Sequence, residues 1–351
     1  MQLGRNVFLL LVLCMSSAGV TQPRGIVQVA DVGDEPEWVI AIHGGAGDTL
    51  RSEVSAEQDA GMRAALVESL QAGAAVLSAG GVGIDAIEAA LTVLEDSPLF
   101  NAGRGAVLDE HGNARHDASI MRGEDRAAGA IAGSSRIRNP ISAAKAVMEQ
   151  TQNVLLSGDG ADWFASEQGL EIVDPIWFET EARRRSLQKN REQSDGPTAS
   201  SEFTKSSESY YGTVGAVVLD THGNIAAGTT TGGRTNKRFG RIGDTPIIGA
   251  GTYAANESCA VSATGHGEYF MRWTVARDIC ARVEYKEETL EDAARFVVLD
   301  TLMPKQGYGA VITLDPKANV VFVTSTAHLK RGVMSSKSDA RVAVFSDEEM
   351  R

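Results

Sequence analysis

The sequence predicts a mixed fold in which short buried strands alternate with helices, and three observations support this. Residues 38–43 form an apolar run with the length and the β-branched content of a buried strand. Four aliphatic residues between Ile84 and Leu94 recur at helical spacing. Two apolar runs, 214–219 and 225–231, flank a polar turn and predict a β-hairpin.

Further helices and a strand are predicted in order along the first half of the chain. Ser55 and Gln58 match a capping box, which predicts a helix to about residue 77. The helix around residues 84–94 should end before Pro98. Residues 128–133 are small enough for a close-packed strand, and Asn139 followed by a proline predicts a helix to about residue 150.

The second half continues this alternation after the first hairpin. Helices are predicted over about 267–283 and 290–302, and a second hairpin should pair 309–314 with 320–325. No internal repeat is found.

Residues 183–209 interrupt the pattern. They are polar, Ser-rich and almost without apolar periodicity, which predicts a mobile surface segment. A flexible linker between two domains is the alternative.

The length and the charge of the chain limit its domain number and the kinds of partner it can have. The chain of 351 residues permits one large domain or two modest ones. Its formal net charge of −13 argues against nucleic acids and anionic membrane surfaces as partners.

The N-terminus is typical of a signal peptide over residues 1–18. Arg5 precedes an apolar run at 7–15, and small residues follow at 16–18. The run is too short to span a bilayer, so we expect an exported protein, periplasmic or secreted, without a membrane contact in its mature form. A buried helix is the alternative. Cleavage would leave Cys259 and Cys280, which are no disulfide framework and lack metal-ligand spacing, so their pairing stays open.

Several catalytic classes lack their motifs. The sequence has no Walker A loop, no dinucleotide-binding G-x-G-x-x-G after a strand and no G-x-S-x-G elbow. His266-Gly-Glu268 resembles the start of a zinc deaminase motif, but no P-C-x-x-C follows. A metal hydrolase therefore has little support.

Thr213 is the most informative residue. It lies between glycines in the run 212–215, after the polar tract and before a predicted strand. If the chain cut itself there, the Thr213 hydroxyl would attack a substrate while its free α-amine accepted the proton. An ordinary junction between a loop and a strand is the alternative.

Downstream residues supply complementary groups. The Thr231 hydroxyl could orient a nucleophile, and the Thr264 hydroxyl with the Gly265 N–H could stabilise an oxyanion near a helix N-terminus. Arg241 could bind a carboxylate and Asp244 an ammonium, so the pair would grip an amino acid by its α-groups. Taken singly, each residue also fits a structural role in a strand, a turn or a solvated ion pair.

In this order, the motifs resemble the plant-type asparaginase / isoaspartyl peptidase family of N-terminal nucleophile hydrolases. The similarity runs from about residue 38 to 326. The matching segments are 42–47 (IHGGAG), 98–105 (PLFNAGRG), 117–121 (DASIM), 212–215 (GTVG), 231–233 (TGG), 240–244 (GRIGD) and 264–265 (TG).

The resemblance implies an α+β fold, a four-layer αββα sandwich made as one precursor. It implies autocleavage between Gly212 and Thr213. The α subunit would comprise 37–212 with the tract 183–209, the β subunit 213–351, and both would form one domain. The family usually assembles as a dimer of αβ heterodimers.

The resemblance also implies roles for individual residues. Thr213 matches the nucleophile, Thr231 its supporting hydroxyl, and Thr264 with Gly265 the oxyanion site. The positions expected to bind substrate or to lie near the scissile bond are Arg241, Asp244, Gly267, Asn101 and Gly45.

A structural sodium ion is implied as well, and no cofactor for catalysis. In relatives a loop like the one between Leu94 and Arg104 wraps this ion with backbone oxygens. The matching residues here are Leu94, Glu95, Ser97, Phe100, Ala102 and Arg104.

The expected reaction is hydrolysis of β-aspartyl amides through a β-aspartyl ester on Thr213, with release of L-aspartate. The expected substrates are L-asparagine and β-aspartyl dipeptides. A glycosylasparaginase and a non-cleaving amino-acid-binding protein are the alternatives. His266 stands where the family commonly has a small hydroxyl residue, which puts the preferred leaving group in question.

Overall fold

The computed structural model describes residues 25–194 and 212–351. The predicted signal peptide at 1–18 lies outside the described residues. The strands are β1 Ile26–Ala30, β2 Val39–Gly47, β3 His116–Arg122, β4 Ala128–Ser134, β5 Leu155–Ser157, β6 Val214–Leu219, β7 Ile225–Thr231, β8 Thr252–Ala254, β9 Ala260–Gly265, β10 Gly309–Leu314, β11 Val320–Thr324, β12 His328–Ser335 and β13 Ser338–Phe345. The α-helices are α1 Ala56–Ser78, α2 Gly83–Asp96, α3 Pro140–Gln150, α4 Gly158–Glu167, α5 Glu181–Ser194, α6 Gly267–Arg272, α7 Val275–Lys286 and α8 Leu290–Arg295.

The described strands form two sheets. The larger has the order β13-β12-β2-β6-β7-β3-β4-β5, and the smaller has the order β1-β11-β10-β9-β8. Neighbouring strands are antiparallel except β4 and β5. Strands β7 and β9, which contain Thr231 and Thr264, and β6, which directly follows Thr213, are therefore interior strands of their sheets.

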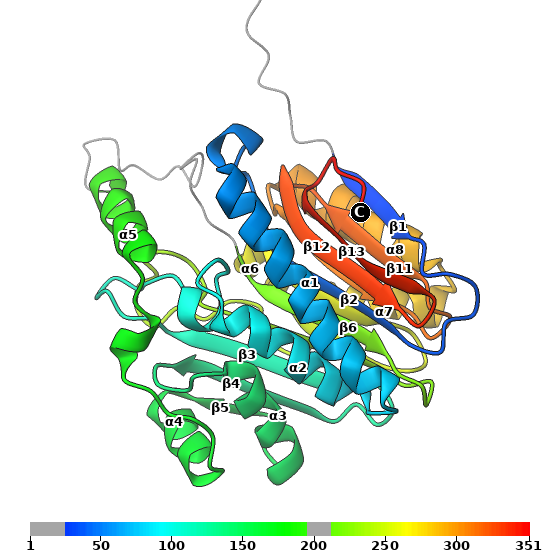
Figure 1. Ribbon diagram of the computed structural model, residues 1–351, viewed down its shortest axis with the longest axis horizontal. Helices are drawn as coiled ribbons and strands as arrows, with labels where there is room; N and C mark the ends of the chain where they lie inside the picture. Colours follow the sequence, from blue (N-terminus) through cyan, green and yellow to red (C-terminus); the bar gives the residue numbers. More distant parts are fainter. Residues whose placement is uncertain (1–24, 195–211) are drawn as a thin grey trace, which may run out of the picture.

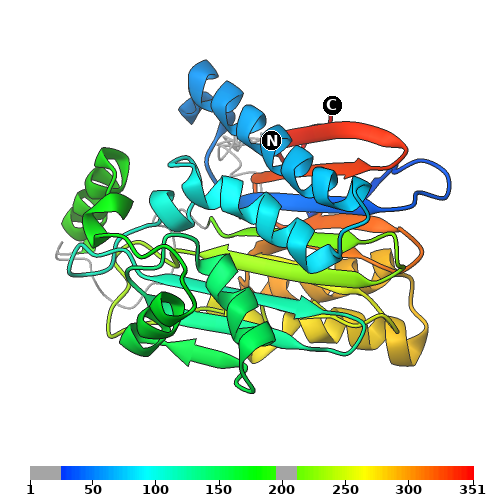
Figure 2. The same ribbon diagram turned by 60° about the horizontal axis from the view of Figure 1, so that its bottom comes forward.

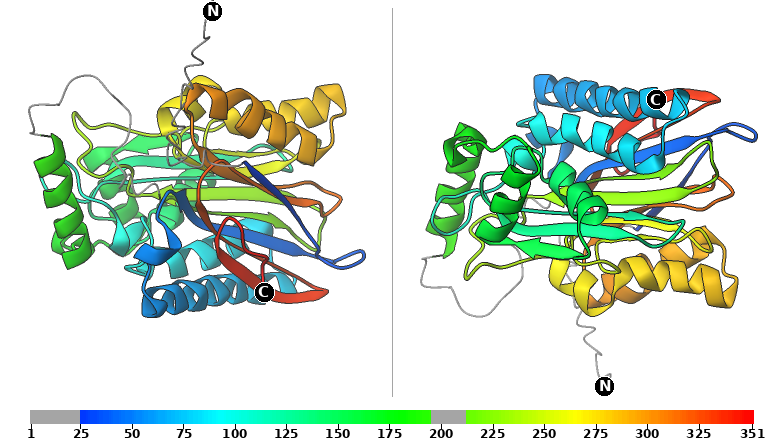
Figure 3. Two further views of the ribbon diagram at one scale, coloured as in Figure 1. Left: turned by 90° about the horizontal axis from the view of Figure 1, so that it is seen from above. Right: turned by 90° about the horizontal axis from the view of Figure 1, so that it is seen from below.

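Helices cover the outer faces of the two stacked sheets (Figure 1). α1, α2 and α3 lie against the larger sheet, and Figure 2 shows them on the same face. α7 and α8 cover the smaller sheet on the opposite side of the molecule (Figure 3). The sheets contact each other through β6, β7, β9 and β10. The order is thus helices, sheet, sheet, helices.

The core strands are buried on both faces. In β2, Val39 and Ala41 belong to the core between the sheets, whereas Ile40 and Ile42 pack among the helices α1 and α2. This alternation follows from the two-residue period of a strand. It explains why the run 38–43 is continuously apolar.

Most predicted elements are confirmed. Both hairpins form, and the first matches 214–219 and 225–231 residue for residue. The Ser55–Gln58 capping box closes at the start of α1. The single helix predicted over 267–283 is wrong, because Thr274 adopts a left-handed φ of 44° between α6 and α7. The helix predicted over 290–302 is α-helical to Arg295 and continues as a π-helix.

The prediction of a mobile segment over residues 183–209 is corrected for its first part, which lies in the helix α5, Glu181–Ser194. Residues 195–209 lie outside the described part of the chain. The sequence of α5 is rich in strong helix formers. Leu187 is buried in a small cluster with Phe178, and the Arg183 guanidinium donates to the Gly105 carbonyl at 2.6 Å. A single anchoring leucine leaves little apolar periodicity to detect.

A disulfide joins Cys259 to Cys280, a pairing the sequence left open. Cys259 directly precedes β9, and Cys280 lies on α7. The bond therefore ties the smaller sheet to the helix that covers it.

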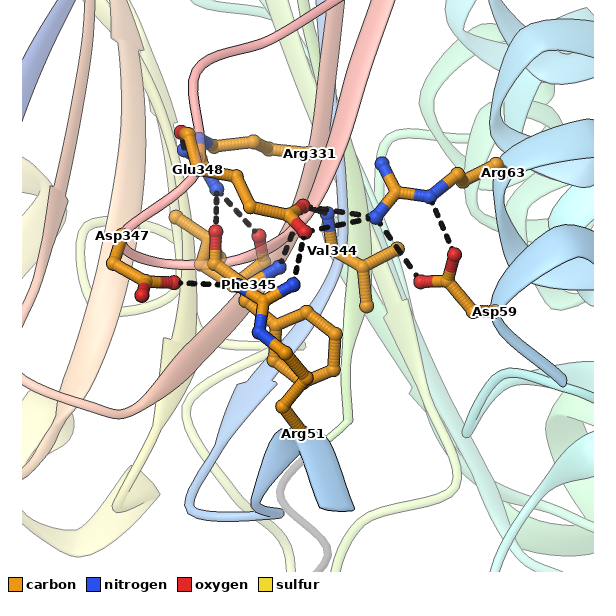
Figure 4. A network of polar contacts seen from close by, with 9 residues as sticks. Arg51, Asp59, Arg63, Arg331, Val344, Phe345, Asp347 and Glu348 are labelled. Atoms are coloured by element: carbon orange, nitrogen blue, oxygen red, sulfur yellow. Dashed lines mark hydrogen bonds and ion pairs between the residues drawn. The ribbon is translucent and has the colours of Figure 1, made fainter. Parts of the chain in front are cut away.

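An ionic cluster around Glu348 fastens the C-terminal segment (Figure 4). The Glu348 carboxylate accepts hydrogen bonds from Arg51 at 2.6 Å, from Arg63 at 2.9 Å and from the Val344 N–H at 2.9 Å. The buried Arg331 donates to the Phe345 carbonyl at 3.0 Å. The cluster joins α1 and the segment after β2 to the end of β13.

Candidate active site

Thr213 lies where the two sheets meet. The β6–β7 ladder pairs Val214 with Thr230, so Thr213 and Thr231 are neighbours at its end. Their hydroxyl oxygens are 3.2 Å apart. Thr264 comes from β9 of the other sheet, and its hydroxyl accepts from the Thr213 N–H at 3.4 Å. Sheet stacking thus brings together three threonines that lie far apart in sequence, all of them buried.

The Gly212–Thr213 peptide is packed against Gly45. Gly45 has a φ of 96°, and a Cβ there would lie 2.6 Å from the Gly212 Cα. Only glycine suits both constraints. Asn101 lies on another side of Gly212, and its side-chain amide donates to the Gly233 carbonyl at 2.8 Å and accepts from the Val107 N–H at 2.8 Å. Both predicted residues therefore lie beside the expected scissile bond.

Arg241 and Asp244 converge in the loop between β7 and β8. A Cβ on Gly267 would lie 2.8 Å from both Arg241 Nη2 and Asp244 Oδ1, so both side chains approach the same bare backbone. Burial raises the pKa of Asp244 to about 7. Its Oδ2 has no hydrogen-bond partner among the described residues. A buried carboxylate oxygen without a hydrogen-bond donor is costly, which marks Asp244 as a candidate ligand-binding group.

One pocket contains most of the predicted residues. Four further predicted residues do not line the pocket but contact residues that do: Thr264, Gly267, Gly45 and Asn101. The lining residues are Gly212, Thr213, Thr231, Gly233, Arg234, Arg241, Gly243, Asp244, Thr245 and Gly265.

Two charged residues of the site escaped the sequence analysis. The Glu268 carboxylate accepts from Arg241 Nε at 2.9 Å and from Nη2 at 3.1 Å, which orients the guanidinium. Lys237 is buried behind the pocket, where it donates to the Gly232 carbonyl at 2.9 Å. Burial lowers the pKa of Lys237, and the nearby Asp117 opposes that shift. In the sequence, the one feature that could have identified Glu268 and Lys237 as site residues is their charge within a Gly- and Thr-rich stretch.

His266 directly precedes α6 at the edge of the site, without a capping hydrogen bond from its side chain. Its Nδ1 lies 2.9 Å from the Gln306 carbonyl, and its ring makes an edge contact with Tyr308 at 5.9 Å. Burial lowers the pKa of this imidazole. His266 does not belong to the lining residues given above.

The arrangement offers nucleophilic chemistry with an amino-acid clamp. The hydroxyls of Thr231 and Thr264 lie beside Thr213. The cationic Arg241 and the acidic Asp244 line the same pocket as Thr213. Within residues 25–194 and 212–351, no group of three or more His, Cys, Asp or Glu side chains could hold a metal ion.

Comparisons with known proteins show which family the sequence resembles. The sequence model of a protein family described as asparaginase matches residues 36–344. The chain is 45% identical over 282 residues to the isoaspartyl peptidase of Salmonella typhimurium, covering 80% of this chain and 90% of that protein. It is 42% identical over 293 residues to the isoaspartyl peptidase of Escherichia coli, covering 84% and 91%. It is 38% identical over 326 residues to the probable isoaspartyl peptidase/L-asparaginase 2 of Arabidopsis thaliana, covering 88% and 99%.

Proposed function

This chain belongs to the asparaginase family, and from that premise we propose that it hydrolyses β-aspartyl amide bonds, as an isoaspartyl dipeptidase and L-asparaginase. One observation supports this most strongly. The hydroxyl of Thr213 lies in the same pocket as Arg241 and Asp244, with Thr231 Oγ1 at 3.2 Å. A substrate held by its α-carboxylate and α-ammonium would present its β-carbonyl to Thr213.

We propose that the chain first cleaves itself. The Thr213 Oγ attacks the Gly212 carbonyl carbon, the Gly212–Thr213 C–N bond breaks, and the Gly212 acyl group moves to oxygen. Water then hydrolyses this ester, which leaves a Gly212 carboxylate and a free Thr213 amine. Close packing of Gly45 against the peptide supports this step, because it holds the Gly212 backbone in place.

In turnover, the free amine takes the proton from the Thr213 hydroxyl as it attacks the substrate. The Thr264 hydroxyl and the Gly265 N–H are the proposed oxyanion donors, and Thr231 orients the nucleophile. The Thr264 hydroxyl oxygen already lies 3.4 Å from the Thr213 nitrogen. The β-amide C–N bond breaks, the departing amine takes the proton from the Thr213 ammonium, and water then hydrolyses the β-aspartyl ester to release L-aspartate.

The layer order described above supports the four-layer αββα sandwich of N-terminal nucleophile hydrolases, with both subunits in one domain. Cleavage at Gly212 would place β6 and β7 in one subunit and β2 and β3 in the other, although β2 pairs with β6 and β3 with β7. The fragments would therefore stay associated. Because β1 at Ile26–Ala30 pairs with β11, we extend the proposed α subunit upstream of residue 37.

The loop between α2 and β3 suits a sodium ion. α2 ends at Asp96, which leaves its last carbonyls, including those of Leu94 and Glu95, without helical partners. A Cβ on Gly103 would collide with the Glu95 carbonyl oxygen, so this oxygen lies directly against the Gly103 backbone within the loop. The negative end of a helix dipole favours a cation. We propose that the oxygens of Leu94, Glu95, Ser97, Phe100, Ala102 and Arg104 hold a structural Na⁺.

We also propose an exported protein that assembles as a dimer of αβ units, with small-molecule substrates and neither nucleic acid nor membrane as partner. The Cys259–Cys280 disulfide supports an oxidising compartment. No helix among the described residues is long and apolar enough to cross a membrane.

Thr213→Ala tests the proposal. The variant should remain one chain on a denaturing gel and lose at least roughly 10⁴-fold in kcat, as removal of a catalytic nucleophile does elsewhere. Thr213→Ser is the matched control and should retain some cleavage. Normal processing of Thr213→Ala would show that another protease cuts the chain.

Three substrates separate the alternatives: β-Asp-Leu, L-asparagine and a GlcNAc-asparagine conjugate. Preference for the conjugate would identify a glycosylasparaginase. An uncut wild-type chain that binds amino acids without turnover would identify a binding protein.

A further inference from the structure

A second arginine lines the pocket beside the proposed clamp. Arg234 belongs to the lining residues together with Thr213, Arg241 and Asp244. The proposed nucleophile and clamp do not use it. Its side chain is 33% exposed, so the guanidinium can meet a ligand without a rearrangement that uncovers it.

The backbone on both sides of Arg234 is fixed by hydrogen bonds. Before it, the Gly233 carbonyl accepts from the Asn101 side-chain amide at 2.8 Å. After it, the Asn236 N–H donates to the Leu108 carbonyl at 2.8 Å. Arg234 thus projects from a well-anchored part of the loop after β7, which suits a residue that binds a ligand.

The nearby Glu268 does not account for Arg234. Each carboxylate oxygen of Glu268 accepts a hydrogen bond from Arg241, at 2.9 and 3.1 Å. Arg234 Nη1 lies 3.9 Å from Glu268 Oε1, which is beyond hydrogen-bond distance. A guanidinium carries five N–H donors, and this ion pair uses none of them in a hydrogen bond. Glu268 therefore orients Arg241 rather than Arg234.

The charges of the candidate substrates give a second arginine a use. L-asparagine carries one carboxylate and one ammonium, which the proposed clamp of Arg241 and Asp244 would satisfy. A β-aspartyl dipeptide has the same two groups and adds the α-carboxylate of its leaving amino acid. It adds no ammonium, because that amine is part of the amide bond. Among the described residues that line the pocket, Arg234 is the cation that remains for this carboxylate.

The spacing of the two arginines suits such a substrate. Six covalent bonds separate the two carboxylate carbons of a β-aspartyl dipeptide, the length of two backbone residues, or roughly 7 Å when extended. Arg241 Nε and Arg234 Nη1 approach the same oxygen, Glu268 Oε1, at 2.9 and 3.9 Å. The two nitrogens are therefore no further apart than the two carboxylates. One dipeptide could contact both guanidinium groups.

We propose that Arg234 binds the α-carboxylate of the leaving amino acid, and so makes β-aspartyl dipeptides the preferred substrates over L-asparagine. The inference rests on the proposed function, since it requires that Arg241 and Asp244 hold the aspartyl α-groups while Thr213 attacks the β-carbonyl. It adds the residue that selects the leaving group: an amino acid with a free carboxylate, rather than ammonia or a sugar amine.

Two substrates isolate the contribution of this carboxylate. β-Asp-Leu and β-Asp-leucinamide share the scissile bond and the leucine side chain, and only the first has the second carboxylate. Arg234→Met should lower kcat/KM for β-Asp-Leu roughly 10- to 100-fold, the size of a lost charge-assisted hydrogen bond, and for the amide by less than about threefold. The wild type should prefer β-Asp-Leu over the amide by a similar factor.

Two further variants sharpen the measurement. Arg234→Lys should keep part of the preference for β-Asp-Leu, because the charge remains while the planar fork is lost. Arg238→Met is the matched control, since it removes an arginine of the same loop that donates to Glu110 at 3.1 Å and does not line the pocket. It should leave the ratio of kcat/KM for the two substrates unchanged.

The outcomes separate this inference from the proposed function. Equal losses with both substrates in Arg234→Met overturn the inference, because they indicate a general effect on the pocket. A wild type that hydrolyses the amide as well as β-Asp-Leu also overturns it. Both results leave β-aspartyl hydrolysis itself established.

A wild type that hydrolyses neither of these substrates nor L-asparagine refutes the proposed function instead. Arg234 is then tested by calorimetric binding of β-Asp-Leu and β-Asp-leucinamide to the wild type and to Arg234→Met. The wild type should bind β-Asp-Leu more tightly than the amide, and Arg234→Met should bind the two alike. Equal affinities in the wild type overturn the inference.

Discussion

Asp244 in the pocket and Glu348 in the C-terminal cluster are acidic side chains whose pKa values move in opposite directions. Burial raises the pKa of Asp244 to about 7. Burial also acts on Glu348, but hydrogen bonds from Val344, Arg51 and Arg63 outweigh it and lower the pKa to about 2. Figure 4 shows how these donors surround the Glu348 carboxylate.

The difference lies in the partners supplied by the protein. Donors reach both oxygens of Glu348, whereas Asp244 Oδ2 has none among the described residues. A charge with all its partners stabilises the fold, and a buried charge without them costs stability unless a ligand supplies the missing contact. We therefore expect Glu348 to matter for folding and Asp244 for substrate binding, and four measurements test this contrast.

The largest effect is expected from Asp244→Asn. Loss of the charged contact to the substrate ammonium should lower kcat/KM for β-Asp-Leu on the order of 10²-fold. The melting temperature at pH 8 should stay equal or rise, because an unpaired buried charge is removed. A clearly lower melting temperature with normal kcat/KM would reverse the contrast.

Glu348→Gln should show the opposite pattern. It weakens charge-assisted hydrogen bonds at a partly exposed site, so the free energy of unfolding in urea should fall by about 1–3 kcal/mol. kcat/KM should remain within twofold of wild type. The exposed neighbour provides the control, since Glu349→Gln should change neither quantity.

The pH dependence of stability should differ between the two variants. The folded pKa of Glu348, about 2, lies below its ordinary 4.5, so its stabilisation is complete above pH 4.5 and is lost as pH falls toward 2. Asp244 has a raised pKa, so it disfavours folding as pH rises from 3.8 toward 7. The unfolding midpoint should be measured from pH 3 to 8. Its dependence on pH should become weaker at the acid end in Glu348→Gln and at the neutral end in Asp244→Asn.

The acid limb of the pH profile of kcat/KM gives a further test of the role of Asp244. Both the free Thr213 amine, with an ordinary pKa of roughly 7.7–8 that Arg241 should lower, and Asp244, near 7, must lose a proton. Two ionisations should make the wild-type limb steeper than tenfold per pH unit. Asp244→Asn should reduce the slope to one ionisation. An unchanged slope would remove Asp244 from the ammonium site.

The smallest effect is expected from His266→Thr, at the edge of the pocket. It should alter the ratio of β-Asp-Leu to L-asparagine turnover by roughly 3-fold, about the value of one weak contact, and leave autocleavage intact. Loss of all turnover with normal cleavage would instead make His266 the base and refute the role of the Thr213 amine.

Parts of the fold and the site were accessible from local sequence patterns, and others were not. The hairpin strands β6 and β7 were predicted to the residue, because a short apolar alternation and a polar turn lie within one segment. β12 and β13 were missed. The former contains the buried Arg331, which obscures the apolar pattern, and only partners distant in sequence, such as Gln28 and Phe345, make that burial tolerable.

The sequence by itself determined which residues are candidates for the chemistry, since hydroxyls, an Arg and an Asp occur in short ordered motifs whose donors and acceptors are properties of residue type. Only the tertiary structure decided how they act together. It stacked β9 on β6 so that Thr264 reaches Thr213, and it placed Glu268 on Arg241. It also gave Asp244 and Glu348 opposite pKa shifts. The physical reason is that burial and hydrogen-bond partners depend on neighbours in space, which a local pattern does not contain.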